Sequence, residues 1–143
     1  MSVCTPTIIN HLSSLIHGIR IAMLTTECED GSLRSRPMAT LDTEFDGTLW
    51  FFTKADSPMV EEINHVDQVN LSYSLADQQR FVSVSGRATL VIDRQKMADL
   101  WNPSFRFWMP QELNDPQIAL LRVDIGKAEY WDYHSCVMVQ VLE

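Results

Sequence analysis

A short segment of the chain, GTLWFFTKADSPMVEEI (Gly47–Ile63), places hydroxyl groups and one lysine where an expected strand passes into an expected helix. Ser57 fits the N-cap and Pro58 the first helical position, and neither role requires a ligand. The backbone N–H groups and the dipole of a helix start also attract a phosphate, and Lys54 would add a charged contact. The segment therefore predicts either a simple helix cap or an anion-binding site.

Two arginines on the preceding strand bear on the same choice. Arg34 and Arg36 stand two positions apart in LRSRPM, so their side chains point to one face of the strand. That face is either a solvated outer surface or a surface turned toward a phosphate beside the helix. The spacing alone leaves both interpretations open.

Other motifs that carry chemistry are absent from the sequence. It contains no GxGxxG after a strand, no GxxxxGK[ST], no GxSxG and no HExxH. The four histidines and three cysteines are scattered, and none pairs at metal-ligand spacing, so no metal site is expected. No pair of carboxylates stands out as a general acid and base, and catalytic residues stay unassigned.

The bulk composition narrows the class of protein. A chain of 143 residues that is 45% apolar and 21% charged predicts one globular domain over residues 1–143. The net charge of −8 argues against binding to nucleic acid or to an anionic membrane surface. No secretory signal is recognised, and no apolar run reaches the length of about 20 residues that spans a bilayer. The cytoplasm is the expected location.

Apolar periodicity and turn residues predict a mainly β, α+β domain: an antiparallel barrel with a few flanking helices. Asp30-Gly31 and Asp46-Gly47 mark tight turns between strands. The third strand is apolar on both faces, which favours a central position. The expected strands are 20–27, 34–44, 49–54, 68–77, 80–93 (interrupted at Gly86) and 118–133 (divided around Gly126), and the expected helices are 5–18, 57–66 and one that starts at Asp93 and breaks at Pro103.

Four stretches in sequence order carry a family resemblance. They are TTECEDGSLRSRPMA, GTLWFFTKADSPMVEEI, FVSVSGRATLV and W…DPQIALLRVDIGKAEYWD, and they fall in the span from about Ile21 to Asp132. In this order they resemble the general stress protein 26 branch of the pyridoxamine 5′-phosphate oxidase-like, flavin-binding split barrels. The resemblance implies a split β-barrel that forms a homodimer, with two FMN sites at the subunit interface.

The resemblance also implies a set of flavin contacts. Arg36 would reach the FMN phosphate, which Ser57 and Pro58 would meet at the helix start. Lys54 and Met59 flank these positions, and Met59 stands where stress-protein relatives carry a lysine. The remaining implied contacts are Pro37 and Met38 at the ring edge, Phe52 and Thr53 from the third strand, Phe81 on the strand before SGRA, and Trp108 of the partner subunit.

The implied function is that of an FMN-dependent oxidoreductase that works with a small-molecule electron donor or acceptor, in a stress response. In such a protein the flavin supplies the redox chemistry, so no catalytic acid or base is needed. True pyridoxamine phosphate oxidase activity is not expected, because the basic residues for its substrate phosphate are not evident. Leu41 and Met59 replace two lysines of the pattern, and this favours the alternative: a non-catalytic flavin-binding or sensing module, or an FMN-free interaction protein on the same fold.

Overall fold

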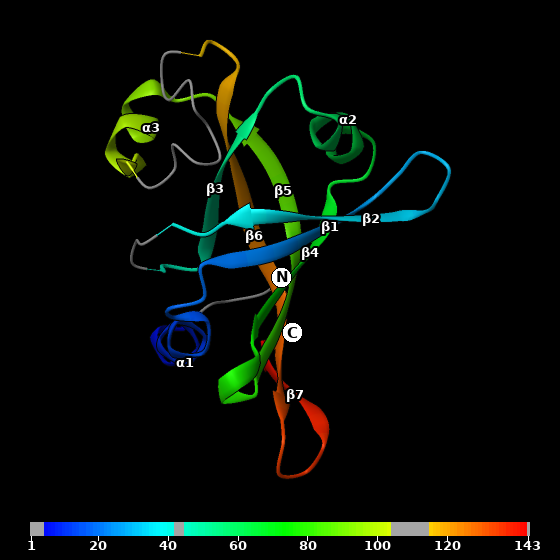
Figure 1. The fold of residues 1–143 in the computed structure, drawn as a ribbon, viewed down its shortest axis with the longest axis vertical. Helices are drawn as coiled ribbons and strands as arrows, with labels where there is room; N and C mark the ends of the chain where they lie inside the picture. The colour runs from blue at the N-terminus through cyan, green and yellow to red at the C-terminus, as the bar shows by residue number, and fades with distance from the viewer. Residues whose placement is uncertain (1–4, 42–44, 104–114, 143) are drawn as a thin grey trace.

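A computed structural model describes residues 5–41, 45–103 and 115–142 of the chain (Figure 1). Seven strands form one antiparallel sheet in the order β2-β1-β4-β5-β6-β3, with β7 added beside β6. The elements are α1 (Pro6–Ile16), β1 (Ile21–Glu27), β2 (Leu33–Ala39), β3 (Thr48–Lys54), α2 (Pro58–His65), β4 (Gln68–Leu75), the 3₁₀ turn η1 (Ala76–Gln78), β5 (Arg80–Val91), α3 (Arg94–Leu100), β6 (Ile118–Asp132) and β7 (Val137–Leu142).

The sheet curls into a barrel that stays open along one line. In Figure 1, β1 and β2 cross in front of the steeper strands β3, β5 and β6. β2 and β3 are the two ends of the strand order and touch one another, but in the described residues no ladder joins them. We call this opening between β2 and β3 the seam. The predicted antiparallel, mainly β architecture with flanking helices is confirmed.

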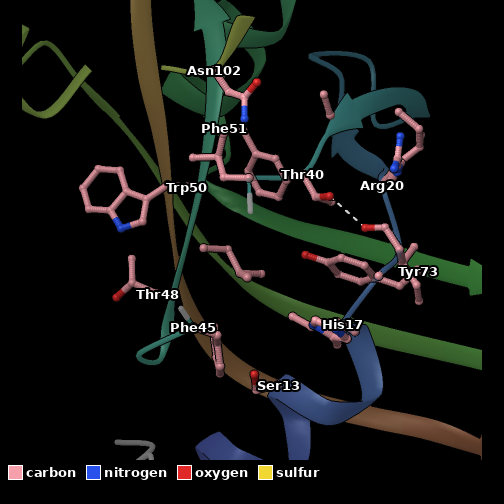
Figure 2. A pocket seen from close by; sticks show the side chains of 17 residues that line it. Ser13, His17, Arg20, Thr40, Phe45, Thr48, Trp50, Phe51, Tyr73 and Asn102 are labelled. Carbon is pink, nitrogen blue, oxygen red and sulfur yellow. Dashed lines mark hydrogen bonds between the residues drawn. The ribbon is translucent and has the colours of Figure 1, made fainter. Parts of the chain in front are cut away.

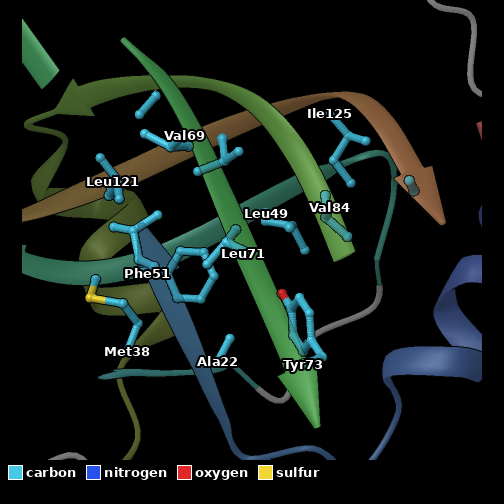
Figure 3. Close-up of a cluster of buried hydrophobic side chains, with 14 of the residues drawn as sticks. Ala22, Met38, Leu49, Phe51, Val69, Leu71, Tyr73, Val84, Leu121 and Ile125 are labelled. Carbon is cyan, nitrogen blue, oxygen red and sulfur yellow. The ribbon is translucent and has the colours of Figure 1, made fainter. Parts of the chain in front are cut away.

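The hydrophobic core has two parts, one on each face of β3. The main cluster fills the barrel and includes Leu49 and Phe51 of β3 (Figure 3). The second lies under α3, where Phe52 packs with Met97 and meets the Trp101 ring edge to face at 5.4 Å. The prediction that this strand is central in the sheet is wrong, because β3 ends the strand order. Its two apolar faces reflect the second cluster under α3.

The long strands differ from their predicted forms. β5 is continuous, and the predicted interruption is a bulge between Ser85 and Gly86 in its pairing with β6. A Cβ at Gly86 would collide with the backbone carbonyl of Asp124, so this position needs glycine. β6 is also one strand and is not divided around Gly126. β7, which no prediction included, pairs with β6 to form a hairpin that extends away from the barrel (Figure 1).

Local signals place the helix ends. Thr5 caps α1 by accepting a hydrogen bond from the Ile8 N–H at 3.3 Å, and Pro6 occupies the first turn. The helix ends at Ile16, two residues earlier than predicted, because Gly18 takes a left-handed φ of +80°. The fully buried Leu12 fixes α1 over one end of the barrel. Among the helices of the described residues, none has the length and apolar character needed to cross a membrane.

Candidate functional site

Ser57 stands at the N-cap of α2 but does not act as a cap. Its backbone is extended, with φ −78° and ψ 153°, yet its side chain makes no capping hydrogen bond. Thr5 and Asp93, at the N-caps of α1 and α3, both accept backbone N–H groups with their side chains. The Ser57 Oγ is buried and has no hydrogen-bond partner in the described part of the chain. A buried hydroxyl left unpaired costs about 1–3 kcal/mol, so this atom requires an explanation.

The end of β3, just before this helix, brings a second hydroxyl and a lysine. Thr53 is buried and Lys54 is exposed, so the two side chains leave opposite faces of the strand. The Lys54 Nζ lies 3.2 Å from the Asp115 Oδ2. The backbone N–H of Gln117, which donates to Asp115, lowers the pKa of that carboxyl, and Lys54 lowers it further. Lys54 therefore already has an ionised carboxylate partner.

Arg34 and Arg36 point to one side of β2, as their spacing predicts, and both reach Glu62 on α2. The Arg36 Nη2 lies 2.7 Å from the Glu62 Oε1, and the Arg34 Nη1 lies 3.0 Å from its Oε2. Thr26 of β1 donates to the Glu62 Oε1 at 2.7 Å and accepts from the Arg36 Nη1 at 2.9 Å. We call Thr26, Arg34, Arg36 and Glu62 the arginine–glutamate cluster. It meets α2 at the fifth residue of the helix.

Glu62 is ionised within this cluster. Its side chain is 11% exposed, and burial by itself raises the pKa of a carboxyl. The Thr26 hydroxyl and the guanidinium groups of Arg36 and Arg34 outweigh burial and hold the pKa of Glu62 below its ordinary value. Arg36 is the less exposed arginine, at 21% against 56% for Arg34. The closest contact of Arg36 is therefore with an internal anion.

The other residues predicted to contact flavin are spread over both core clusters and the exposed surface. Met38 and Met59 are buried in the main core cluster, and Phe52 in the second. Pro37 and Pro58 are exposed. Phe81 is half-buried on β5, paired with Ser74 of β4. Trp108 lies outside the described residues.

Glu62 and Thr26 are the residues that the sequence analysis missed. The Asp30-Gly31 turn joins β1 and β2 and sets the register that brings Thr26 opposite Arg34. The predicted turn was therefore sufficient to place Thr26 beside Arg34. Glu62 joins it only because α2 packs across β1, a long-range contact that local patterns do not specify.

The same fold occurs in known proteins. The family model described as pyridoxamine 5′-phosphate oxidase like matches residues 8–143. The protein bli-3 of Neurospora crassa is 30% identical over 132 residues, which are 85% of this chain and 63% of that protein. The chain thus spans less than two thirds of this relative.

Two solved structures are similar over most of their length. General stress protein 26 of Bacillus anthracis superposes with a TM-score of 0.76 at 20% identity, covering 93% of this chain and 98% of the other. A general stress FMN/FAD-binding protein of Xanthomonas citri superposes with a TM-score of 0.72 at 29% identity, covering 89% of each chain. These similarities confirm the predicted resemblance to the general stress protein 26 branch. With the family match over nearly the whole sequence, they place the chain in the pyridoxamine 5′-phosphate oxidase-like family of split barrels.

Proposed function

We propose that this protein binds FMN, with the flavin phosphate at the start of α2. The observation that carries the proposal is the buried Ser57 Oγ, which no described residue satisfies although it stands at an N-cap. A phosphate oxygen would accept the hydrogen bond of this hydroxyl and lie at the positive end of the helix dipole. The Xanthomonas citri relative is described as an FMN/FAD-binding protein, which supports a flavin as the ligand.

The surrounding residues would hold the cofactor in distinct ways. Ser57 would bind the phosphate directly, and Arg36 and Lys54 would balance its charge while sharing contact with Glu62 and Asp115. Thr53 would line the site from β3. The remaining predicted contacts are Pro37, Met38, Phe52, Pro58, Met59, Phe81 and Trp108 of the partner subunit.

With FMN bound, the protein would act as an oxidoreductase on a small electron donor or acceptor. The flavin supplies hydride or single-electron transfer, and the protein binds and orients it and excludes water. One observation favours the alternative, a flavin-binding or sensing module or an FMN-free interaction protein. Arg36 and Lys54, the two cations proposed to balance the phosphate charge, already have carboxylate partners. A weaker attraction for the phosphate would follow.

We also propose that the protein is a homodimer with its flavin sites between the subunits. One outer face of the sheet carries apolar side chains that a partner would cover: Met23 is 39% and Leu33 is 69% exposed. The β1–β2 register pairs Met23 with Pro37 and Glu27 with Leu33, so these side chains share that face. Exposed apolar groups gathered on one face are typical of an interface.

An absorbance spectrum separates the two functions. The protein is purified, incubated with excess FMN and passed through a desalting column, and its flavin absorbance is recorded before and after anaerobic addition of NADPH or NADH. Retained flavin that bleaches supports the oxidoreductase. Retained flavin that does not bleach with either reductant supports the binding module. If the protein retains no flavin after desalting and a titration with FMN detects no binding, the proposed cofactor is contradicted.

A further inference from the structure

A cavity lies between the end of α1 and the seam (Figure 2). It has a volume of about 620 Å³, within the range of small-molecule sites. The end of α1, the segment after β2 and the first half of β3 all contribute to its lining. None of the described residues that line it is among those predicted to contact flavin. We call it the seam cavity.

The floor of the seam cavity is apolar apart from one hydroxyl. Phe45, Leu49 and Phe51 line it and are each less than 10% exposed. Tyr73 is 1% exposed, and Figure 2 shows its hydroxyl directed toward the cavity. Among the described residues none forms a hydrogen bond with this hydroxyl. Burial raises the pKa of Tyr73, so the phenol stays protonated and can donate a hydrogen bond.

The rim of the seam cavity is polar and carries positive charge. His17, Arg20 and Asn102 line it and are exposed, so they mark its opening. No carboxylate is found among the described lining residues, and Arg20 forms no ion pair with any described residue. The floor therefore presents one neutral donor inside an apolar pocket, and the rim presents a guanidinium at its entrance.

We infer that the seam cavity binds a small aromatic acid. Its flat body would lie against the rings of Phe45 and Phe51, an oxygen at its inner end would accept the Tyr73 hydroxyl, and its carboxylate would face Arg20. The aromatic lining favours a flat molecule over a branched one. The Tyr73 hydroxyl and the Arg20 guanidinium then each have a partner that the described protein residues do not supply.

Three related probes test each contact separately: 6-hydroxy-2-naphthoate, 2-naphthoate and 2-naphthol. Binding is followed by two-dimensional amide NMR, and NOEs to the Leu49 methyls and the Tyr73 ring locate the probe. The hydroxylated acid should bind about two- to tenfold more tightly than 2-naphthoate, because only it offers an oxygen to the inner hydroxyl. The wild-type ratio and the NOEs decide the question even if a variant fails to fold.

Two variants complete the test. Tyr73→Phe removes a hydroxyl that bonds no described residue, and it should abolish the preference for 6-hydroxy-2-naphthoate. Arg20→Gln should weaken both acids about threefold or more and leave 2-naphthol unchanged. Arg87→Gln, at an exposed arginine that does not line the cavity, is the matched control and should change nothing.

The flavin proposal provides an independent comparison. Saturating FMN should leave the affinity for 6-hydroxy-2-naphthoate unchanged, since the two sets of residues do not overlap. The inference is overturned by the absence of saturable binding at millimolar probe, by NOEs to residues outside the cavity, or by an unchanged preference in Tyr73→Phe. Competition by FMN would also overturn it, because the cavity would then belong to the flavin site.

Discussion

At the scale of single residues, substitution of Ser57 distinguishes a structural helix cap from a ligand-binding residue. Replacing a working N-cap by alanine costs about 1 kcal/mol, and Asp93→Ala, which removes the acceptor for the Lys96 N–H, should cost that amount. Ser57→Ala removes an unpaired buried hydroxyl, so without ligand we expect no loss in the free energy of unfolding and a gain of at most about 1–3 kcal/mol. FMN affinity should nevertheless fall about tenfold.

Urea denaturation and flavin fluorescence titration measure these two effects. If Ser57→Ala destabilises the free protein as much as Asp93→Ala does, then the serine is a structural cap. If the stability is not reduced and FMN affinity is unchanged, then the buried hydroxyl does not face the phosphate.

The carboxylate of Glu62 reduces the attraction that Arg36 can exert on an anionic ligand. Glu62→Gln keeps the shape of the side chain and removes the anion that Arg34 and Arg36 contact. It lies five residues after the N-cap, about 7.5 Å along the helix axis. We expect FMN to bind about tenfold more tightly at low salt, and the gain to shrink as salt rises. Glu61→Gln, an equal charge change at the exposed neighbouring residue, is the control and should give a smaller gain.

The same substitution predicts a pH dependence of stability. Because the folded-state pKa of Glu62 lies below its unfolded value, the stabilisation is present above the unfolded pKa of about 4.3 and is lost as the pH falls through the folded pKa. At pH 7, Glu62→Gln should lower the free energy of unfolding by about 1–2 kcal/mol. Denaturation curves at pH 7 and pH 3 should show the wild-type advantage shrinking at the lower pH. An advantage that is equal at both pH values would contradict the role given to this carboxylate.

At the scale of elements, the close approach of β5 to β6 beside the bulge, where Gly126 of β6 is the extra residue, depends on a missing side chain at Gly86. Gly86→Ala would force a methyl group into the Asp124 carbonyl and should destabilise the fold by about 1–3 kcal/mol. Gly126→Ala on the facing strand is the matched control, since its Cβ would meet only the Ser85 oxygen at 3.9 Å. Thermal or urea unfolding compares the two variants. Equal losses would mean that the loss of Gly86 acts through general strand flexibility rather than through close packing.

Turns and helix starts could be predicted at this scale, but packing between distant elements could not. The Asp30-Gly31 turn and the Ser57-Pro58 helix start were predicted correctly, because each depends on a few adjacent residues. The contact of Arg36 with Glu62 joins residues 26 positions apart, and it depends on where α2 lies on the sheet. The two apolar faces of β3 correctly predicted that the strand is buried. They did not predict its place at the end of the strand order, because α3 rather than a neighbouring part of the sheet covers one face.

At the scale of the whole molecule, the proposed dimer predicts the mass of the protein in solution and the residues that form its interface. Sedimentation equilibrium at micromolar concentration should give twice the chain mass of 16.4 kDa. Met23→Glu should shift the protein toward monomer, because it places a charge on the apolar outer face of β1 and β2. Ile92→Glu makes the same kind of change at a side chain that is 65% exposed and follows β5, and it should leave the dimer intact. A wild-type monomer would contradict the proposal.

The proposed function depends on a flavin phosphate bound at the start of α2. Calorimetric titration of the wild-type protein with FMN and with riboflavin, which lacks only the phosphate, tests it most directly. Charged hydrogen bonds contribute about 1.5–3 kcal/mol each, so FMN should bind about a hundredfold more tightly than riboflavin. Equal affinities for the two flavins, or no heat of binding from either, would contradict a phosphate site at the start of α2.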